Sequence, residues 1–332
     1  NDIVQLCEQT MLACLQDSFV DCVWRESSQW LGDGLVQSKT LWSMSDDVRP
    51  MQKLLLDTAQ GQDAQGMVPS VAPAEVHAYT IPRYGCMRVE LLAFYLEVTR
   101  DEAFVRQPLI RDCFLRLMAF FTDNSPRDAN GLHITPPGRR HYIDWSPTSQ
   151  ANPHAVYNLH IVLTLLTAAS LARPVLPEQA DAWAAEAVRL RRLCREMFWN
   201  GRFWQDDLVG STHSQLAAAM ALLVGAVTDD ERAKQLDLIV ARSLDASDEL
   251  EAGKMVLASP FMHHYLFEAL CDGGRETAVV EIIKLRWGRW GEGGYPTTWE
   301  NWNVDFPDGS HCHAFSAHPR YHLWQIQKGV GR

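Results

Sequence analysis

Long apolar runs, clusters of basic residues and paired cysteines are all missing from this sequence of 332 residues. No apolar run approaches the roughly 18 residues of a membrane-spanning helix, and residues 1–5 lack the basic segment that opens a signal peptide. Lysine and arginine form no long run and the formal net charge is -11. We therefore expect no membrane span and no nucleic-acid partner. These patterns leave the compartment, cytoplasmic or exported, and the oligomeric state open.

The cysteines are scattered through apolar segments, without a Cys-x-x-Cys pair or a dense framework. We expect them to be reduced thiols in the core. Cys312 lies between His311 and His313, but no second cluster of cysteine and histidine follows nearby to complete a tetrahedral metal site. The eight positions are Cys7, Cys14, Cys22, Cys86, Cys113, Cys194, Cys271 and Cys312.

Cofactor motifs are missing as well. The chain contains no Gly-x-Gly-x-x-Gly, no Walker-type phosphate loop and no Gly-x-Ser-x-Gly elbow. His263, His264 and Glu268 lack the His-Glu-x-x-His order of a zinc protease, so we interpret them as packing residues. We expect neither a cofactor nor a metal.

The spacing of apolar residues predicts a helical chain. Apolar positions recur with helical period in twelve segments, which pair into six hairpins. Asp2, Asp229 and the step from Ser259 to Pro260 fit helix starts. The predicted segments are residues 2–18, 33–46, 49–60, 83–99, 103–122, 151–173, 177–198, 211–226, 229–243, 260–272, 275–288 and 312–327.

Strand signals are sparse and confined to residues 68–71, 133–135 and 202–205. No linker or repeat divides the chain, so we expect one domain over residues 1–332. Twelve helices in up-down order can close into a toroid, with the odd-numbered helices on the inside and a pocket among the loops at one end. The loops rich in Trp, Tyr, Pro, Gly and charge, which predict that pocket, are residues 20–33, 62–84, 124–150 and 289–311.

Ionisable groups and tryptophans are concentrated in the first of these loops. A solvated charge cluster beside two core tryptophans is the plain interpretation. The combination also suits sugar cleavage, which needs a carboxylic acid and a carboxylate on opposite faces of the sugar, while indole rings pack on its apolar faces. The residues are Asp21, Arg25, Glu26 and Asp33, with Trp24 and Trp30.

A second carboxylate, Glu300, lies between Trp299 and Trp302 near the other end of the chain. Indole rings that wall a carboxylate remove part of its hydration, which favours a role as a base near neutral pH. Glu292 is the nearest competitor, but the glycines around it favour a flexible surface position.

Other loop positions suit either a pocket lining or a helix-entry anchor. Asp144 stands beside Trp145 in the middle loop, and Tyr84 stands near the start of a predicted helix. His313 precedes the last helix and suits a hydrogen bond to a carboxylate or to a sugar hydroxyl, or a structural role.

Together these motifs resemble the catalytic domain of inverting α-L-rhamnosidases of glycoside hydrolase family 78, and the resemblance spans almost the whole chain. The first family signature, Asp-Cys-Pro-x-Arg-(Asp)-Glu followed by Gly-Trp-x-Gly-Asp, is matched near the start, and the closing signature, Thr-Thr-x-Trp-Glu with a later Ser-x-x-His-Ala-aromatic, near the end. The matching residues are Asp21, Cys22, Arg25, Glu26, Trp30, Gly32 and Asp33, then Thr297-Thr298-Trp299-Glu300 and Ser310-His311-Cys312-His313-Ala314-Phe315.

The resemblance implies an all-α, six-hairpin (α/α)6 barrel that hydrolyses a carbohydrate substrate without a cofactor. Glu26 would be the general acid and Glu300 the general base, with carboxyl groups about 6.5 to 9.5 Å apart as inversion requires. The substrate-binding residues implied in addition are Asp21, Arg25, Trp30, Asp33, Tyr84, Asp144, Trp145, Trp299 and His313.

The chain also departs from the family pattern. Val23 and Trp24 replace the usual proline and polar residue, and Gln29 stands where glycine normally precedes the tryptophan. These differences bear on the sugar more than on the fold. Family members usually carry β-sandwich domains ahead of the barrel, and we expect this chain to be an excised or minimal form without them.

Other functions stay open at this point. A six-hairpin glycosidase for another deoxy sugar or a uronide would be favoured by Arg83 or Arg289 pointing into the pocket. A catalytically silent sugar-binding barrel would use the same carboxylates only to bind hydroxyls. A helical scaffold for protein partners would need a broad exposed apolar face and leaves the loop carboxylates unexplained.

Overall fold

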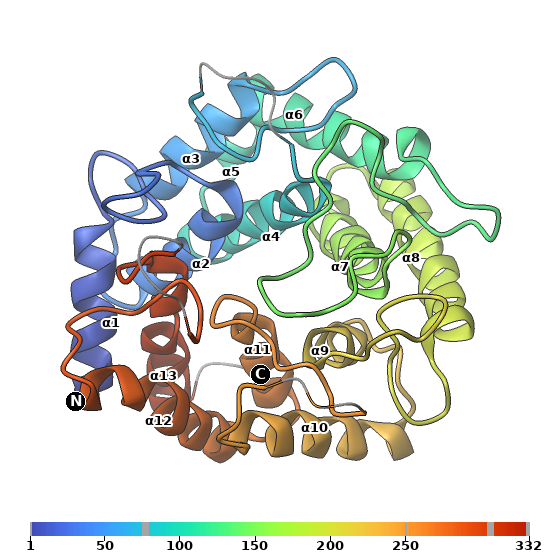
Figure 1. Cartoon of the computed structure of the whole chain (residues 1–332). Helices are drawn as coiled ribbons and strands as arrows, with labels where there is room; N and C mark the ends of the chain where they lie inside the picture. Colours follow the sequence, from blue (N-terminus) through green and yellow to red (C-terminus); the bar gives the residue numbers. More distant parts are fainter. Residues whose placement is uncertain (1, 75–79, 250, 252, 304–308, 330–332) are drawn as a thin grey trace.

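Helices alternate between an outer and an inner ring in the computed structural model, which describes residues 2–74, 80–249, 251, 253–303 and 309–329 (Figure 1). The outer ring consists of α1 (Asp2–Ala13), α3 (Arg49–Gln60), α6 (Pro108–Ala119), α8 (Pro177–Phe198), α10 (Asp229–Leu244) and α12 (Glu276–Glu292). The inner ring consists of α2 (Leu31–Trp42), α4 (Pro82–Thr99), α7 (Ala155–Ala172), α9 (Gln215–Leu223), α11 (His263–Asp272) and α13 (Pro319–Lys328). This arrangement is the six-hairpin toroid that the resemblance implied.

Burial distinguishes the two rings. The outer helix α8 buries one stripe, spaced every three or four residues, and exposes charged residues on its other face. The inner helix α9 buries eight of its nine residues, from Gln215 to Leu222. The prediction that odd-numbered helices line the inside was wrong: the second helix of each hairpin does, because these helices are apolar on most sides. The buried stripe of α8 is Ala180, Trp183, Ala187, Leu190, Cys194 and Phe198.

Helix α7 corrects the expectation about apolar runs. Its 18 residues have a mean hydropathy of 1.6, so by length and composition alone it could cross a membrane. Of its residues, 72% are buried within the ring of helices. A core helix of a large globular domain has the same composition, since it is surrounded by protein on all sides.

Prolines account for two of the boundary errors. Residues 49–60 and 177–198 are helical as predicted, but the predicted helix 103–122 is divided into α5 (Glu102–Val105), α6 and a π-helical turn at Phe120–Asn124. Pro108 begins α6 because its ring fits the first helical turn but not a helix interior. Pro319 likewise begins α13, after a 3₁₀ turn at Ala314–Ala317.

The short extended pieces predicted from the sequence form only isolated bridges among the described residues. Val71 pairs with Trp30, His133 with Arg127, and Trp204 with Trp199. All eight cysteines are free thiols, as expected, and six of them are buried.

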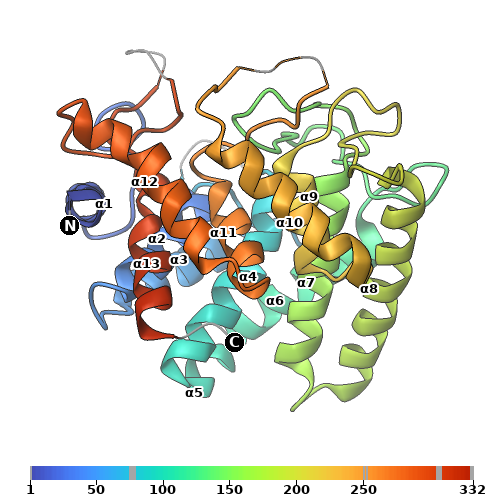
Figure 2. The same ribbon diagram turned by 90° about the horizontal axis from the view of Figure 1, so that it is seen from below.

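Every loop that joins an outer helix to the following inner helix lies at the same end of the rings, the upper edge in Figure 2. The loop between α1 and α2 and the loop between α12 and α13 come from opposite ends of the sequence. The closed ring places them side by side, because α13 packs against both α1 and α2. The fold therefore brings the two predicted carboxylate clusters to one place.

Gly32 allows the inner helices α2 and α4 to approach closely at this end. A Cβ on Gly32 would lie 2.5 Å from Cε1 of Tyr84, whereas a Cβ on the helical Gly288 would meet only Ile3 Cδ1, at 3.9 Å. We predict that Gly32→Ala lowers the free energy of unfolding by about 1–3 kcal/mol through overpacking. Gly288→Ala should raise it by up to about 1 kcal/mol through helix propensity.

Urea unfolding followed by circular dichroism measures both variants. Equal effects of the two substitutions would show that the contact between Gly32 and Tyr84 does not limit the packing of α2 on α4.

Candidate active site

A cavity of about 420 Å³ opens at the loop end of the toroid. Charged and polar side chains come from the first and last loops, from the first turn of α2 and from the middle loop. Aromatic side chains come from the first loop, from α4, from the middle loop and from the 3₁₀ turn at Ala314–Ala317. Its lining consists of Asp21, Glu26, Trp30, Asp33, Ile81, Tyr84, Arg140, Tyr142, Trp145, Glu300, His313 and Phe315.

Backbone pairing between distant segments positions the acidic residues. The segment 310–314 pairs with residue 21 on one side and with residues 298–300 on the other. The hydrogen bonds run from Ala314 N to Asp21 O (2.9 Å), from His313 N to Thr298 O (2.9 Å) and from Glu300 N to Ser310 O (2.8 Å). Three stretches of chain are thereby fixed in register around the cavity.

Glu26 stands at the mouth of the cavity with 35% of its side chain exposed. Its Oε2 accepts a hydrogen bond of 2.6 Å from Trp30 Nε1. Partial burial and the nearby charge of Asp21 raise the pKa of Glu26, and the bonds to Trp30 and Arg25 oppose that rise. The environment of Glu26 thus favours retention of its proton.

Glu300 is buried, with 6% exposure. Arg25 Nη2 donates to both of its carboxylate oxygens at 2.6 Å, and Ser310 N donates to Oε2 at 2.8 Å. These donors hold the carboxylate group in place. The carboxylate therefore has charged and polar partners, where the sequence analysis expected one walled by indoles.

Arg25 links the two glutamates. Its Nη2 is 2.6 Å from Glu300 Oε2 and 3.4 Å from Glu26 Oε1. The closest oxygens of the two carboxylates therefore lie at most about 6 Å apart. This upper bound falls below the range of about 6.5–9.5 Å that accompanies inversion and includes the range of about 5–5.5 Å that accompanies retention. This separation is shorter than the one implied by the resemblance, because one guanidinium binds both groups.

Asp33 and His313 form a buried pair beneath the glutamates. His313 Nε2 lies 3.3 Å from Asp33 Oδ1, and each residue is 3% exposed. Burial raises the pKa of Asp33 to about 6, although His313 opposes the rise. Burial lowers the pKa of His313, but the hydrogen bond to Asp33 and the charges of Asp33 and Glu300 outweigh it and leave the pKa raised.

Two buried polar atoms at the cavity have no hydrogen-bond partner among the described residues. They are Asp21 Oδ2 and His313 Nδ1. Asp21 Oδ1 accepts from Ser28 N at 2.8 Å, so only its second oxygen is available. Buried polar atoms are normally paired, and these two can bind the hydroxyl groups of a ligand. One atom each of Asp21, Cys22 and His313 also lie within 4.8 Å of one another, close enough to ligate a metal.

Aromatic rings form one wall of the cavity. Trp30 meets Tyr84 edge to face with ring centroids 6.2 Å apart, and Tyr84 meets Tyr142 in the same way at 5.9 Å. Tyr142 in turn contacts Trp145 at 5.4 Å. The predicted residues Trp30, Tyr84 and Trp145 all line the cavity.

Arg140 is a lining residue that the sequence analysis missed. Its guanidinium lies 5.8 Å from the centre of the Tyr142 ring and 5.7 Å from that of Trp145. The signal was present in the sequence, since Arg140 lies four residues before Asp144 in the same loop. Tyr142, Ile81 and Phe315 also line the cavity and were not among the predicted site residues.

Three predicted residues, Arg25, Asp144 and Trp299, are absent from the described lining. Asp144 is buried and accepts hydrogen bonds from Trp145 N at 2.8 Å and Ser259 N at 2.9 Å, so it joins the middle loop to the segment before α11. Trp299 stacks on His311 with centroids 4.0 Å apart. Asp144 and Trp299 therefore contact neighbours of the lining residues and support the cavity wall from behind.

Comparison with known proteins identifies a family. A family model described as the bacterial alpha-L-rhamnosidase 6 hairpin glycosidase domain matches residues 1–326. Comparison with curated proteins finds no match.

Three solved structures share the fold. A family 78 rhamnosidase of Bacillus sp. GL1 is 23% identical with a TM-score of 0.83, over 97% of this chain and 34% of that one. A Klebsiella oxytoca rhamnosidase with rhamnose bound is 21% identical with a TM-score of 0.82, over 98% of this chain and 63% of that one. A Streptomyces avermitilis alpha-L-rhamnosidase complexed with L-rhamnose is 19% identical with a TM-score of 0.72, over 98% of this chain and 31% of that one.

This chain thus spans about a third to nearly two thirds of the length of these relatives. The family model, in contrast, covers almost all of this chain. The chain therefore belongs to the family of bacterial alpha-L-rhamnosidase six-hairpin glycosidase domains.

Proposed function

We propose that this chain is the catalytic domain of an α-L-rhamnosidase, which hydrolyses terminal α-L-rhamnosyl residues with inversion. The observation that carries the proposal is the meeting of Glu26 and Glu300, from opposite ends of the sequence, in one cavity with an aromatic wall. Glycoside hydrolysis needs such a pair of carboxyl groups. Rhamnose bound in two rhamnosidases of the same fold supports the choice of sugar.

Glu26 is proposed as the general acid that protonates the glycosidic oxygen. Burial and the charge of Asp21 raise its pKa, which favours the protonated form that a general acid needs. The Trp30 indole N–H holds one carboxyl oxygen. The other oxygen then carries the proton toward the leaving group.

Glu300 is proposed as the general base that activates water. Its two donors, Arg25 and the Ser310 amide, hold the carboxylate in a fixed orientation. Because Arg25 bridges the two glutamates, we propose that it leaves Glu300 and binds a sugar hydroxyl when substrate enters. That movement provides the space for water that inversion requires.

The remaining site residues are proposed to bind the sugar. Asp21 Oδ2 and His313 Nδ1, which have no hydrogen-bond partner among the described residues, bind its hydroxyls, and Asp33 orients His313. His313 Nδ1 also lies 3.7 Å from Glu300 Oε2. The rings of Trp30, Tyr84 and Trp145 pack on its apolar face. Asp144 and Trp299 position the walls from behind.

Arg140 favours one alternative substrate. Neither Arg83 nor Arg289 is among the described lining residues, since Arg83 binds His160 and Arg289 binds Asp248. Arg140 does line the cavity, and a guanidinium there suits the carboxylate of a uronide. A substrate panel must therefore include uronides, and Arg140→Gln should abolish uronide turnover if that alternative is correct.

Replacement of either glutamate tests the proposed roles. We predict that Glu26→Gln and Glu300→Gln each lower kcat for p-nitrophenyl α-L-rhamnoside at least about 100-fold, the lower range for loss of a general acid or base. Glu292→Gln, an exposed control at the end of α12, should retain activity. Release of p-nitrophenol measures the rates, and titration calorimetry with L-rhamnose measures binding.

The stereochemistry is tested on the wild type. Inversion predicts that proton NMR detects β-L-rhamnose first, and initial α-L-rhamnose would rule it out. A wild type that binds L-rhamnose but cleaves no glycoside at any pH would identify a sugar-binding barrel instead.

Asp21 should control the pH profile through Glu26. The Asp21 charge raises the pKa of Glu26, and the proposed acid is active only while protonated, so activity falls as pH rises through that pKa. We predict that Asp21→Asn moves the alkaline limb of kcat/KM to lower pH. Asparagine keeps an oxygen that can accept from Ser28 N.

Asp47→Asn is the matched control, because Asp47 pairs with Arg49 on the surface. An alkaline limb that stays in place or moves upward in Asp21→Asn would contradict the assignment of Glu26 as the acid.

A further inference from the structure

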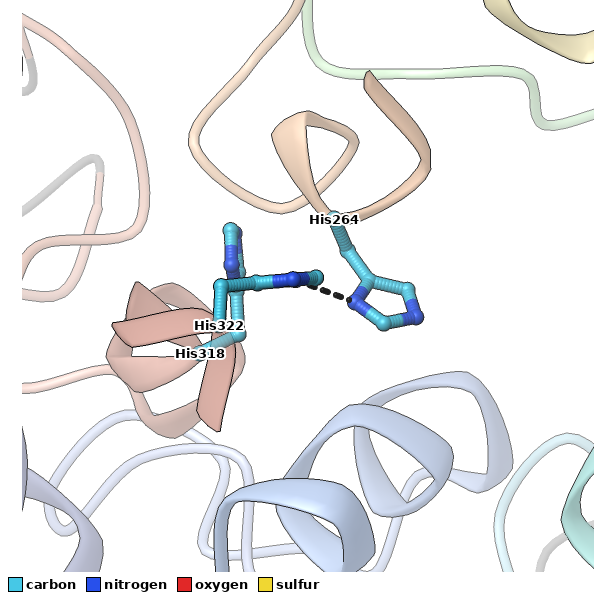
Figure 3. A group of neighbouring side chains, drawn as sticks. All are labelled: His264, His318 and His322. Atoms are coloured by element: carbon cyan, nitrogen blue, oxygen red, sulfur yellow. Dashed lines mark hydrogen bonds between the residues drawn. The ribbon is translucent and has the colours of Figure 1, made fainter. Parts of the chain in front are cut away.

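Three buried histidines meet where the inner helices α11 and α13 face each other. His264 comes from the first turn of α11, and His318 and His322 come from the start of α13 (Figure 3). All three are fully buried at 0% exposure. None of them is among the described residues that line the candidate active site.

The spacing on α13 places two imidazoles on one face. His318 and His322 are four residues apart, and His318 already has helical backbone angles, with φ -61° and ψ -18°. Histidines at i and i+4 of a helix can ligate one metal ion together, as in zinc proteases. One ring nitrogen from each of the three histidines lies within 4.8 Å of the others.

The tautomers leave ring nitrogens available at the centre of the cluster. His318 Nε2 donates to Pro260 O at 2.8 Å, so Nδ1 carries a lone pair, and this buried atom has no hydrogen-bond partner among the described residues. His264 Nδ1 faces His322 Nε2 at 3.1 Å. Two nitrogens on a tetrahedral Zn²⁺ are about 3.3 Å apart, given Zn–N bonds of about 2.0–2.1 Å.

The surroundings resemble the outer shell of a metal site. The Glu268 carboxylate lies 3.5 Å from His264 Nε2, on the side of the ring away from His322, and the Pro260 carbonyl binds His318. Carboxylates and carbonyls in these positions orient the histidine ligands of metals. The Lys39 ammonium also lies 3.1 Å from His264 Nε2. Glu268 forms an ion pair with Lys39 at 2.8 Å and offsets the lysine charge.

Hydrogen bonds within the protein do not satisfy all of the ring nitrogens in this cluster. Without a metal, Lys39 can donate a hydrogen bond to His264, and His264 can donate one to His322. Nδ1 of both His318 and His322 then still lacks a hydrogen-bond partner among the described residues, which is unusual for buried polar atoms.

We propose that His264, His318 and His322 bind one transition-metal ion of the Zn²⁺ class, which ties α11 to α13. Nitrogen ligands of this kind suit Zn²⁺, Ni²⁺ and Cu²⁺ and disfavour Ca²⁺ and Mg²⁺. The proposal does not depend on the proposed glycosidase activity. It replaces the sequence-based interpretation of His264 and Glu268 as packing residues.

Metal binding to the untagged full chain tests the proposal. Metal-stripped protein is loaded with Co²⁺ or Zn²⁺ alone, both in the native state and during refolding, because the site is buried. We expect one ion per chain by elemental analysis, the visible absorption of nitrogen-ligated tetrahedral Co²⁺, and a Tm raised by Zn²⁺. Ca²⁺ should leave the Tm unchanged.

Variants inside and outside the cluster show whether the metal binds at these three histidines. His322→Gln should weaken Co²⁺ binding at least about tenfold, and Glu268→Gln, which removes no ligand, about 10–100-fold. His263→Gln, a buried neighbour outside the cluster, should bind as the wild type does.

Absence of stoichiometric metal in both native and refolded wild type would overturn the proposal. Equal affinity in His322→Gln and His263→Gln would also overturn it. A near-ultraviolet thiolate band with Co²⁺ would place the ion at Asp21, Cys22 and His313 instead.

Discussion

Pairing of the first loop with the last is the constraint on which the candidate site depends. Asp21 O accepts from Ala314 N, and His313 N donates to Thr298 O, so residues almost 300 positions apart share one register. Six hairpins in a ring must bring their two ends together, and these backbone bonds fix how they meet. If the segment 310–314 shifted by one residue, His313 would turn away from Asp33, because successive extended side chains point to opposite sides.

The pairing of these two loops also determines which charged groups meet at the site. Asp21, Glu26, Asp33 and Glu300 gather around one cavity, and four adjacent negative charges would repel one another. Arg25 neutralises part of this charge by binding Glu300 and approaching Glu26. Burial and mutual repulsion favour protonation of Asp33 and Glu26. One region therefore contains a carboxyl group that tends to keep its proton and a carboxylate held by cationic and amide donors, which is the difference that acid–base chemistry requires.

The sequence predicts the fold well because helical periodicity is a local property. Helices α3 and α8 have the predicted ends, and errors occur where proline restarts a helix, as at Pro108 and Pro319. Cavity residues are harder to predict, because their positions depend on loop conformation. Motif spacing predicted that Glu26 and Glu300 lie at one site, and both line the cavity. Trp299, in contrast, stacks on His311 outside the described lining, and Arg140 lines the cavity beside two aromatic rings. Neither outcome follows from the order of residues alone.

Ring closure also depends on contacts deeper in the toroid. The loop-end pairing attaches the last hairpin at one end of the ring, and its helix α13 also packs against α1 and α2. His264, His318 and His322 provide a second point within the inner ring, and Lys39 extends the same contacts to α2. Glu300 lies in the loop between α12 and α13, so contacts that hold α13 in the ring also constrain the position of Glu300, although none of the three histidines lines the described cavity. A change that loosened α11 from α13 would therefore act on the geometry of the two carboxylates rather than on the sugar contacts alone.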